Sequence, residues 1–141
     1  MPGTSSPTAR VRAVVLNYNG GEHVLRCVQA LLDSEWPADS LDVVVVDNAS
    51  SDGSIERIQA ELPGARVVHN PTNDGFPANN LAMRDLDDVD VLALVNNDAF
   101  VEPDWLPPLV AALDEDPTLG AACPLLLFAP SFVDVHLEAD A

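Results

Sequence analysis

Apolar residues along the chain gather in short continuous runs that alternate with segments of helical spacing. Four of these runs cover residues 11–16, 41–46, 65–69 and 91–95, and they are rich in valine and leucine. Such runs are typical of parallel strands whose two faces are both buried. Between them, apolar residues recur three or four positions apart, which predicts helices. The alternation predicts an α/β fold with a mostly parallel sheet flanked by helices.

Polar residues in front of the helical segments predict where three helices begin. Asn19 followed by Glu22 predicts a capping box at the start of the first helix. Ser51 and Asp104 are predicted as the N-caps of two later helices. A further short helix is predicted over residues 76–84.

The length of 141 residues suits one domain and is too short for two ordinary ones. We expect residues 1–10 to be a flexible lead and residues 11–128 to form the domain. A fifth apolar run covers residues 120–128, and we expect it to lack some of its normal cover.

The charge of the chain excludes two classes of partner. The sequence has six basic residues, all of them arginine, against 23 acidic ones, so the formal net charge is -17. A nucleic-acid backbone or an anionic membrane surface would need a basic face, which such a chain lacks. A small anionic ligand remains compatible with this charge only if another group supplies positive charge.

The sequence also limits location and cysteine chemistry. No apolar run approaches the 18 residues of a membrane-spanning helix, and the N-terminus lacks the apolar core of a secretory signal. We therefore expect a cytoplasmic protein, which in a longer form could lie at the inner face of the membrane. Cys27 and Cys123 are expected to be buried free thiols, and no cysteine–histidine spacing suggests a zinc site.

Polar side chains follow three of the predicted strands where each strand ends. Ligands in parallel α/β sheets bind at the carboxyl ends of the strands, near the point where the strand order reverses. We expect these side chains to converge there. They are Asn17 and Tyr18 after the first strand, Asp47 and Asn48 after the second, and Asn96, Asn97 and Asp98 after the fourth.

Each cluster has a chemical interpretation and a simpler one. A carboxylate at Asp98 beside two carboxamides suits Mg²⁺ or Mn²⁺, which bind one or two carboxylates and substrate phosphates; otherwise the three residues form a polar turn or helix cap. Asp47 and Asn48 suit the edge of a base or a ribose, or else an Asx turn. Tyr18 suits stacking on a base, or else a half-buried position in a loop.

Five motifs in order carry a family resemblance. They are residues 14–19 (VVLNYN), 45–54 (VVDNASSDGS), 73–80 (NDGFPANN), 94–98 (LVNND) and 103–106 (PDWL). Together they resemble family 2 glycosyltransferases of the GT-A fold, especially the rhamnosyltransferase-like branch. The likeness extends over nearly the whole predicted domain.

The resemblance implies an inverting transfer of a sugar from a UDP- or dTDP-sugar to a glycan or lipid-linked acceptor, with Mg²⁺ or Mn²⁺ as cofactor. It is typical of cell-wall or polysaccharide biosynthesis. Asp98 matches the metal-binding residue of the DxD-type motif, and Asn96 matches its first residue, which faces the ribose. The implied nucleotide-sugar-binding residues are Asn17, Tyr18, Asp47, Asn48, Asn80, Asn96 and Asn97.

The family's general base lies further along the chain than any residue present. We expect it beyond Ala141, because Asp134, Glu138 and Asp140 do not sit in the family's acidic motif. Residues 129–141 are then the start of the acceptor-binding and catalytic part. Two alternatives remain open: a metal-dependent nucleotidyltransferase, and a non-catalytic nucleotide-binding or interaction module.

Overall fold

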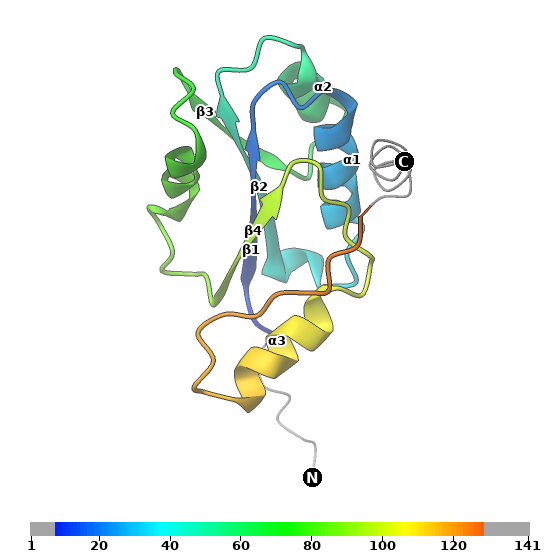
Figure 1. The fold of residues 1–141 in the computed structure, drawn as a ribbon, viewed down its shortest axis with the longest axis vertical. Helices are drawn as coiled ribbons and strands as arrows, with labels where there is room; N and C mark the ends of the chain where they lie inside the picture. Colours follow the sequence, from blue (N-terminus) through cyan, green and yellow to red (C-terminus); the bar gives the residue numbers. More distant parts are fainter. Residues whose placement is uncertain (1–7, 129–141) are drawn as a thin grey trace, which may run out of the picture.

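The computed structural model describes residues 8–128, which contain one parallel sheet with helices on both of its faces (Figure 1). Along the chain the elements are β1 (Val11–Asn17), α1 (Gly21–Leu32), η1 (Ala38–Ser40), β2 (Leu41–Asn48), α2 (Ser54–Glu61), β3 (Arg66–Asn70), η2 (Phe76–Met83), β4 (Val91–Asn96) and α3 (Leu106–Glu115). The strands lie in the order β3-β2-β1-β4, and each neighbouring pair is parallel. The strand order therefore reverses between β1 and β4, and the predicted α/β fold is confirmed.

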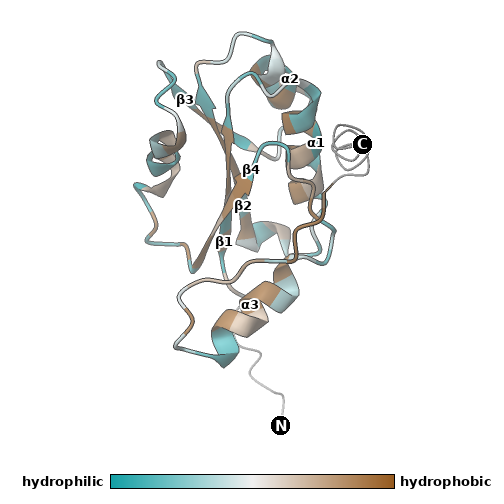
Figure 2. Ribbon diagram, in the orientation of Figure 1, coloured by the Kyte–Doolittle hydropathy of each residue, from teal (hydrophilic) through white to brown (hydrophobic). Residues whose placement is uncertain are grey.

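The strands at the centre of the fold are apolar (Figure 2). Side chains that alternate along β1 and β2 divide the hydrophobic core between the two faces of the sheet. Under α1 and α2 the buried strand residues are Ala13, Val15, Val43 and Val45. Under η2 they are Val14, Val44 and Val46. Because both faces are covered, these strands are continuous apolar runs in the sequence.

The third part of the core lies at the amino end of β1, where α3 packs against Val11. Two tryptophans complete this contact and satisfy their indole N–H groups. Trp36 Nε1 donates to the carbonyl of Ala9 at 3.0 Å, and Trp105 Nε1 donates to Ser34 Oγ at 2.9 Å. Both rings therefore serve packing, at the end of the sheet opposite the predicted ligand site.

The capping box predicted at Asn19 and Glu22 is wrong. Gly20 precedes α1 and has no side chain that could cap it, and the Gly21 N–H in the first turn donates instead to Asp52 Oδ2 at 2.8 Å. Asn19 instead adopts a φ of 50° and bonds to the loop between β2 and α2. Its N–H donates to Ser50 Oγ at 2.9 Å, and its Oδ1 accepts from the Ser51 N–H at 2.8 Å. The residue holds two loops together and caps neither helix.

The N-caps predicted at Ser51 and Asp104 are also wrong. Gly53 precedes α2 with a φ of 79°, a conformation in which glycine is favoured. Asp52 Oδ1 accepts from both the N–H and the hydroxyl of Ser54, at 3.1 and 2.6 Å. At the start of α3, no side chain makes a capping hydrogen bond.

The helix predicted over residues 76–84 is present, but it is the 3₁₀-helix η2. Runs of 3₁₀ structure this long are uncommon. A side chain supports this one, because Asn79 Nδ2 donates to the carbonyl of Phe76 at 3.0 Å. The tighter winding changes which side chains of this segment point toward the sheet.

Residues 120–128 form no helix or strand, and their side chains are exposed. Leu125 is 86% exposed and Leu127 is 83% exposed, so the expectation that this run lacks cover is confirmed. Cys123 is exposed, which corrects the prediction that it is buried, and it is a free thiol, as is Cys27. The sequence pattern failed for Cys123 because an apolar run is buried only where another part of the fold covers it.

The segments predicted on either side of the domain lie mostly outside the described residues. Residues 1–7 and 129–141 are not described, which includes most of the predicted lead and all of the predicted start of a further part. At the end of the lead, Arg10 pairs with Asp88 at 2.7 Å and with Asp90 at 3.2 Å. No helix among residues 8–128 combines the length and apolarity needed to cross a membrane.

Candidate functional site

The carboxyl ends of β1, β2 and β4 meet at one edge of the sheet, as the sequence predicted. Asn17 lies opposite Asp47 in the pairing of β1 with β2, and Leu16 lies opposite Asn96 in the pairing of β1 with β4. Because the pairing is parallel and in register, the polar residues that follow these strands are brought together.

A cavity of about 300 Å³ opens at the end of β4, on the face of the sheet that η2 covers. Alternation along the strand directs Leu94 and Asn96 toward that face. The lining residues are Leu16, Phe76, Asn79, Leu94, Val95, Asn96, Asn97 and Asp98. The structure thus brings the predicted Asn96, Asn97 and Asp98 together with two residues that the sequence analysis missed, Phe76 and Asn79.

The motif of residues 73–80 contains both missed residues, but the sequence analysis assigned a different residue of that motif to the site. Asn80, predicted as a site residue, is exposed and does not line the cavity, whereas its neighbour Asn79 is 4% exposed and does. The choice between adjacent asparagines depends on the winding of η2, which local sequence did not indicate. Phe76 belongs to the motif of residues 73–80, but the sequence analysis assigns it no role in the site.

Asn17 is a buried hydrogen-bonding centre beneath the site. Its side chain is fully buried, and its Nδ2 donates to Ser50 Oγ and Ser54 Oγ, both at 3.0 Å. A longer bond of 3.4 Å reaches Asp47 Oδ1, and the Asn17 Oδ1 accepts from the Gly20 N–H at 3.1 Å. The residue thereby joins β1 to the loops that follow β1 and β2.

Asp47 and Asn48 are likewise buried and bonded within the protein. Asp47 Oδ2 accepts from the Ser50 N–H at 3.3 Å. Asn48 Nδ2 donates to the carbonyl of Gly75 at 3.0 Å, and its Oδ1 accepts from Asn70 Nδ2 at 2.9 Å. Asn48 therefore fixes the glycine at which η2 begins.

Tyr18 lies outside the cavity, in the loop between β1 and α1. Its side chain is 50% exposed, and it belongs to none of the buried clusters. Asn97 projects toward α1, because a Cβ added to Gly20 would lie 2.9 Å from Asn97 Nδ2. The predicted site residues thus form one neighbourhood with two parts, the loop at Tyr18 and the cavity at Asp98.

Asp98 is the one acidic residue among those that line the cavity, and neither arginine nor histidine lines it in the described part of the chain. Its exposed carboxylate makes no hydrogen bond or ion pair with residues 8–128. Within that range no three His, Cys, Asp or Glu side chains form a metal cluster. A single free carboxylate beside carboxamides fits a hard cation whose other ligands are water and phosphate oxygens.

Cys27 lies behind the end of β4, where its thiol donates to the carbonyl of Asn96 at 3.3 Å. Burial, with a smaller contribution from the charge of Asp98, raises the pKa of Cys27 to about 12. Because the thiolate is the reactive form, we expect Ellman's reagent at pH 8 to modify one thiol quickly in the folded chain, that of exposed Cys123. The second thiol should react only after denaturation.

A Cys123→Ser variant is the control for that assignment. It should lose the fast reaction and keep the thiol that is released in denaturant. Fast modification of the folded Cys123→Ser chain would contradict the buried position of Cys27.

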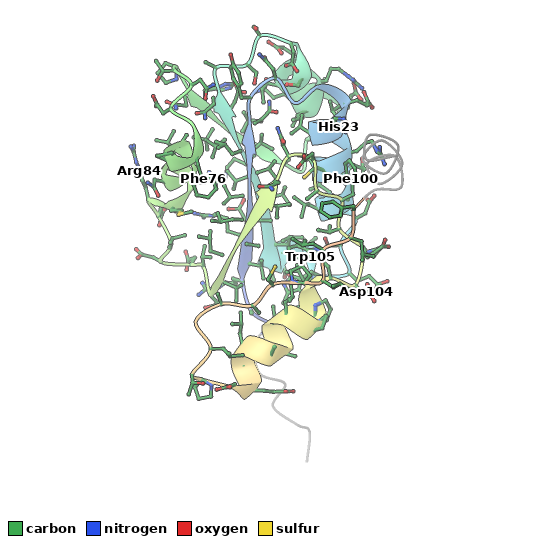
Figure 3. All side chains as sticks on the ribbon, in the orientation of Figure 1. His23, Phe76, Arg84, Phe100, Asp104 and Trp105 are labelled. Carbon is green, nitrogen blue, oxygen red and sulfur yellow. The ribbon has the colours of Figure 1, made fainter. Side chains whose placement is uncertain are left out.

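A larger groove of about 430 Å³ lies between α1 and α2 and contains none of the predicted site residues. Its cations are already engaged. Arg57 pairs with Glu22 and Glu61, each at 2.8 Å, and Arg26 lies 4.2 Å from the centre of the Phe100 ring. Figure 3 shows Phe100 on the α1 side of the sheet and Phe76 on the opposite side.

Comparisons with known proteins identify the family and the fold. The sequence model of the family described as "Glycosyl transferase family 2" matches residues 13–134. No curated protein matches the chain.

Solved structures share the fold over most of this chain. TarS of S. aureus in complex with UDP-GlcNAc is 21% identical, with a TM-score of 0.68 over 82% of this chain and 37% of that chain. The mannosyltransferase PcManGT from Pyrobaculum calidifontis, in complex with GDP-Man and Mn²⁺, is 28% identical, with a TM-score of 0.70 over 85% of this chain and 37% of that chain. The match to a further TarS structure covers 24% of the TarS chain. This chain therefore spans well under half of the proteins it resembles.

Proposed function

The chain belongs to glycosyl transferase family 2 and has the GT-A fold that the sequence predicted, and from this premise we propose that it binds the nucleotide-diphospho-sugar donor of a glycosyl transfer. The observation that carries the proposal is the cavity at the end of β4, where Asp98 has a free carboxylate beside Asn96 and Asn97. This position is the one at which parallel α/β sheets bind ligands.

Charge explains why a cation belongs to the proposal. The chain has a net charge of -17, and none of the described residues that line the cavity is cationic. Such a site repels a diphosphate. Mg²⁺ or Mn²⁺ held by Asp98 supplies positive charge that binds the diphosphate and stabilises it as a leaving group. PcManGT, which resembles this chain, is described in complex with Mn²⁺.

The remaining predicted residues divide by what their side chains are free to do. Tyr18 and Asn96 are exposed, and we assign them to the base and the ribose. The side chains of Asn17, Asp47 and Asn48 already have partners within the protein, so their proposed contribution is to hold the loops that receive the nucleotide. Asn80 is retained as a weaker donor contact at the exposed face of η2.

The donor class follows from the same resemblance. We propose a UDP- or dTDP-sugar as the donor. We add GDP-sugars because the structurally similar proteins are described in complex with UDP and UDP-GlcNAc (TarS) and with GDP-Man (PcManGT). The proposal also includes an inverting displacement onto an acceptor hydroxyl and membership of the rhamnosyltransferase-like branch. It further includes a cytoplasmic location and a role in cell-wall or polysaccharide biosynthesis. Since an inverting transfer needs a base and Asp98 is assigned to the cation, donor binding is the activity to measure on this chain.

Calorimetry of the 141-residue chain with UDP-GlcNAc, with Mn²⁺ or with EDTA, tests the proposal. We expect binding with Mn²⁺ and at least roughly tenfold weaker binding in EDTA, because the unscreened carboxylate then faces the diphosphate. Equal affinity in the two buffers would contradict the cation's role. Tighter binding of UTP than of every nucleotide-sugar would favour a nucleotidyltransferase.

A further inference from the structure

We propose that Phe76 is the platform on which the sugar ring of the donor lies, an assignment that rests on the proposed donor binding and adds a specificity-determining residue to it. Phe76 lines the same cavity as Asp98, and its side chain is 67% exposed (Figure 3). Large apolar side chains are individually common on protein surfaces, so exposure alone would mean little. The argument depends on how firmly this one is held and on what faces it.

The backbone of Phe76 is fixed on both sides by buried carboxamides. Asn48, which is 1% exposed, donates to the carbonyl of Gly75, and Asn79, which is 4% exposed, donates to the carbonyl of Phe76 itself. Gly75 has a φ of 68°, a value that glycine adopts without strain. The chain therefore enters η2 at a set angle, which places the ring at the cavity before any ligand arrives.

Packing of η2 on the sheet does not use the ring. The η2 residues that pack against the sheet are Ala78, Leu81 and Ala82. Phe76 therefore presents an aromatic face that the core leaves uncovered, held on a rigid backbone. Binding sites for small molecules combine such apolar walls with a few placed polar groups.

The composition of the lining suits a sugar ring. Phe76 and Leu94 provide apolar surface, and the exposed side chains of Asn96 and Asp98 provide polar groups beside it. A pyranose has the matching character, since its C–H bonds form an apolar face and its hydroxyls form a polar edge. The electron-rich face of an aromatic ring attracts those C–H groups.

Size and position favour the sugar over the base. A volume of about 300 Å³ lies at the lower end for ligand pockets, so it holds one ring-sized group and not a whole nucleotide-sugar. Tyr18, the aromatic residue assigned to the base, lies outside this cavity. Asp98, assigned to the diphosphate through its cation, and Asn96, assigned to the ribose, both lie at the end of β4, so Phe76 on η2 is left to the other ring that the diphosphate carries, the sugar.

Phe100 serves as the control for Phe76, because it is also an exposed phenylalanine and has no assigned role in ligand binding. It is 40% exposed, and the guanidinium of Arg26 covers its ring at 4.2 Å. It lines the groove beside α1 and not the cavity at Asp98. A Phe100→Ala variant removes the same side chain from the opposite side of the sheet.

The test measures two affinities for each variant by calorimetry in Mn²⁺: UDP-GlcNAc and UDP, with GDP-Man and GDP as a second pair. We expect Phe76→Ala to weaken binding of the nucleotide-sugar roughly three- to tenfold and to leave the affinity for the nucleoside diphosphate within about twofold. Phe76→Tyr, which keeps the ring, should behave as the unsubstituted chain does. Phe100→Ala should change neither affinity.

Each other result overturns a defined part of the assignment. If Phe76→Ala weakens UDP and UDP-GlcNAc equally, the ring contacts the nucleotide and the sugar assignment is wrong. If Phe76→Ala changes neither, the ring has no role in donor binding, although the proposed function stands. If the unsubstituted chain binds no nucleoside diphosphate with Mn²⁺, the proposed function itself fails, and this inference fails with it.

Discussion

Replacement of Asp98 by asparagine is expected to weaken cation-dependent binding of a UDP-sugar by roughly 100-fold without unfolding the chain. The carboxylate is the one negative charge on the described lining of the cavity, and no bond within residues 8–128 neutralises it. Asparagine keeps the shape of the aspartate side chain and removes its negative charge. A divalent cation would then have only carboxamide and carbonyl oxygens to bind from the protein, which suit Mg²⁺ or Mn²⁺ less well.

Calorimetry with UDP-GlcNAc and Mn²⁺ measures this effect, and far-UV circular dichroism checks the fold. Asp87→Asn is a matched control, because Asp87 is exposed and does not line the cavity. The substitution removes the same charge away from the site. If both variants weaken binding equally, the effect comes from the net charge of the chain and not from a cation at Asp98. An unchanged affinity in Asp98→Asn would remove the residue from the site.

Asn17→Ala is expected to lower the free energy of unfolding by about 2–4 kcal/mol. The substitution leaves Asp47, which is 5% exposed, without one of its donors and leaves the Gly20 N–H without its acceptor. Buried polar groups that lose their partners retain the cost of desolvation. Because the loops after β1 and β2 are joined through this side chain, donor binding should fall with stability.

Urea unfolding followed by circular dichroism gives the magnitude. Asn80→Ala is the control, since Asn80 is exposed on η2 and its loss should change stability by no more than about 0.5 kcal/mol. A similar loss in both variants would show that Asn17 has no special place in the fold. A stable Asn17→Ala chain with unchanged binding would contradict the hydrogen-bonding centre described above.

Strand positions could be predicted because their signal is local and strong. β1 and β2 are buried on both faces, so their middle residues form unbroken apolar runs that are visible without knowledge of the fold. The polar residues that end those runs are visible for the same reason. Parallel pairing then brings Asn17, Asp47 and Asn96 to one edge, and this convergence could be expected before the structure was known.

Helix starts could not be predicted in the same way. Asn19 and Ser51 have the side chains of N-caps, but neither caps a helix, and Asn19 Oδ1 instead accepts from the backbone N–H of Ser51 and ties two loops together. A residue that can cap a helix can equally bond to a neighbouring loop, and the sequence does not distinguish the two. The burial expected for Cys123 failed because burial depends on a neighbour that a local pattern does not contain.

By itself the sequence determined the α/β class and the edge of the sheet at which the polar residues meet, because both depend on chain order and on the alternation of apolar and polar residues. Only the tertiary structure decided which side chains are free to meet a ligand. It committed Asn17, Asp47 and Asn48 to internal bonds, and it placed Asn79 and Phe76 at the cavity. Those outcomes depend on the winding of η2 and on contacts between loops distant in the chain, which sequence spacing does not specify.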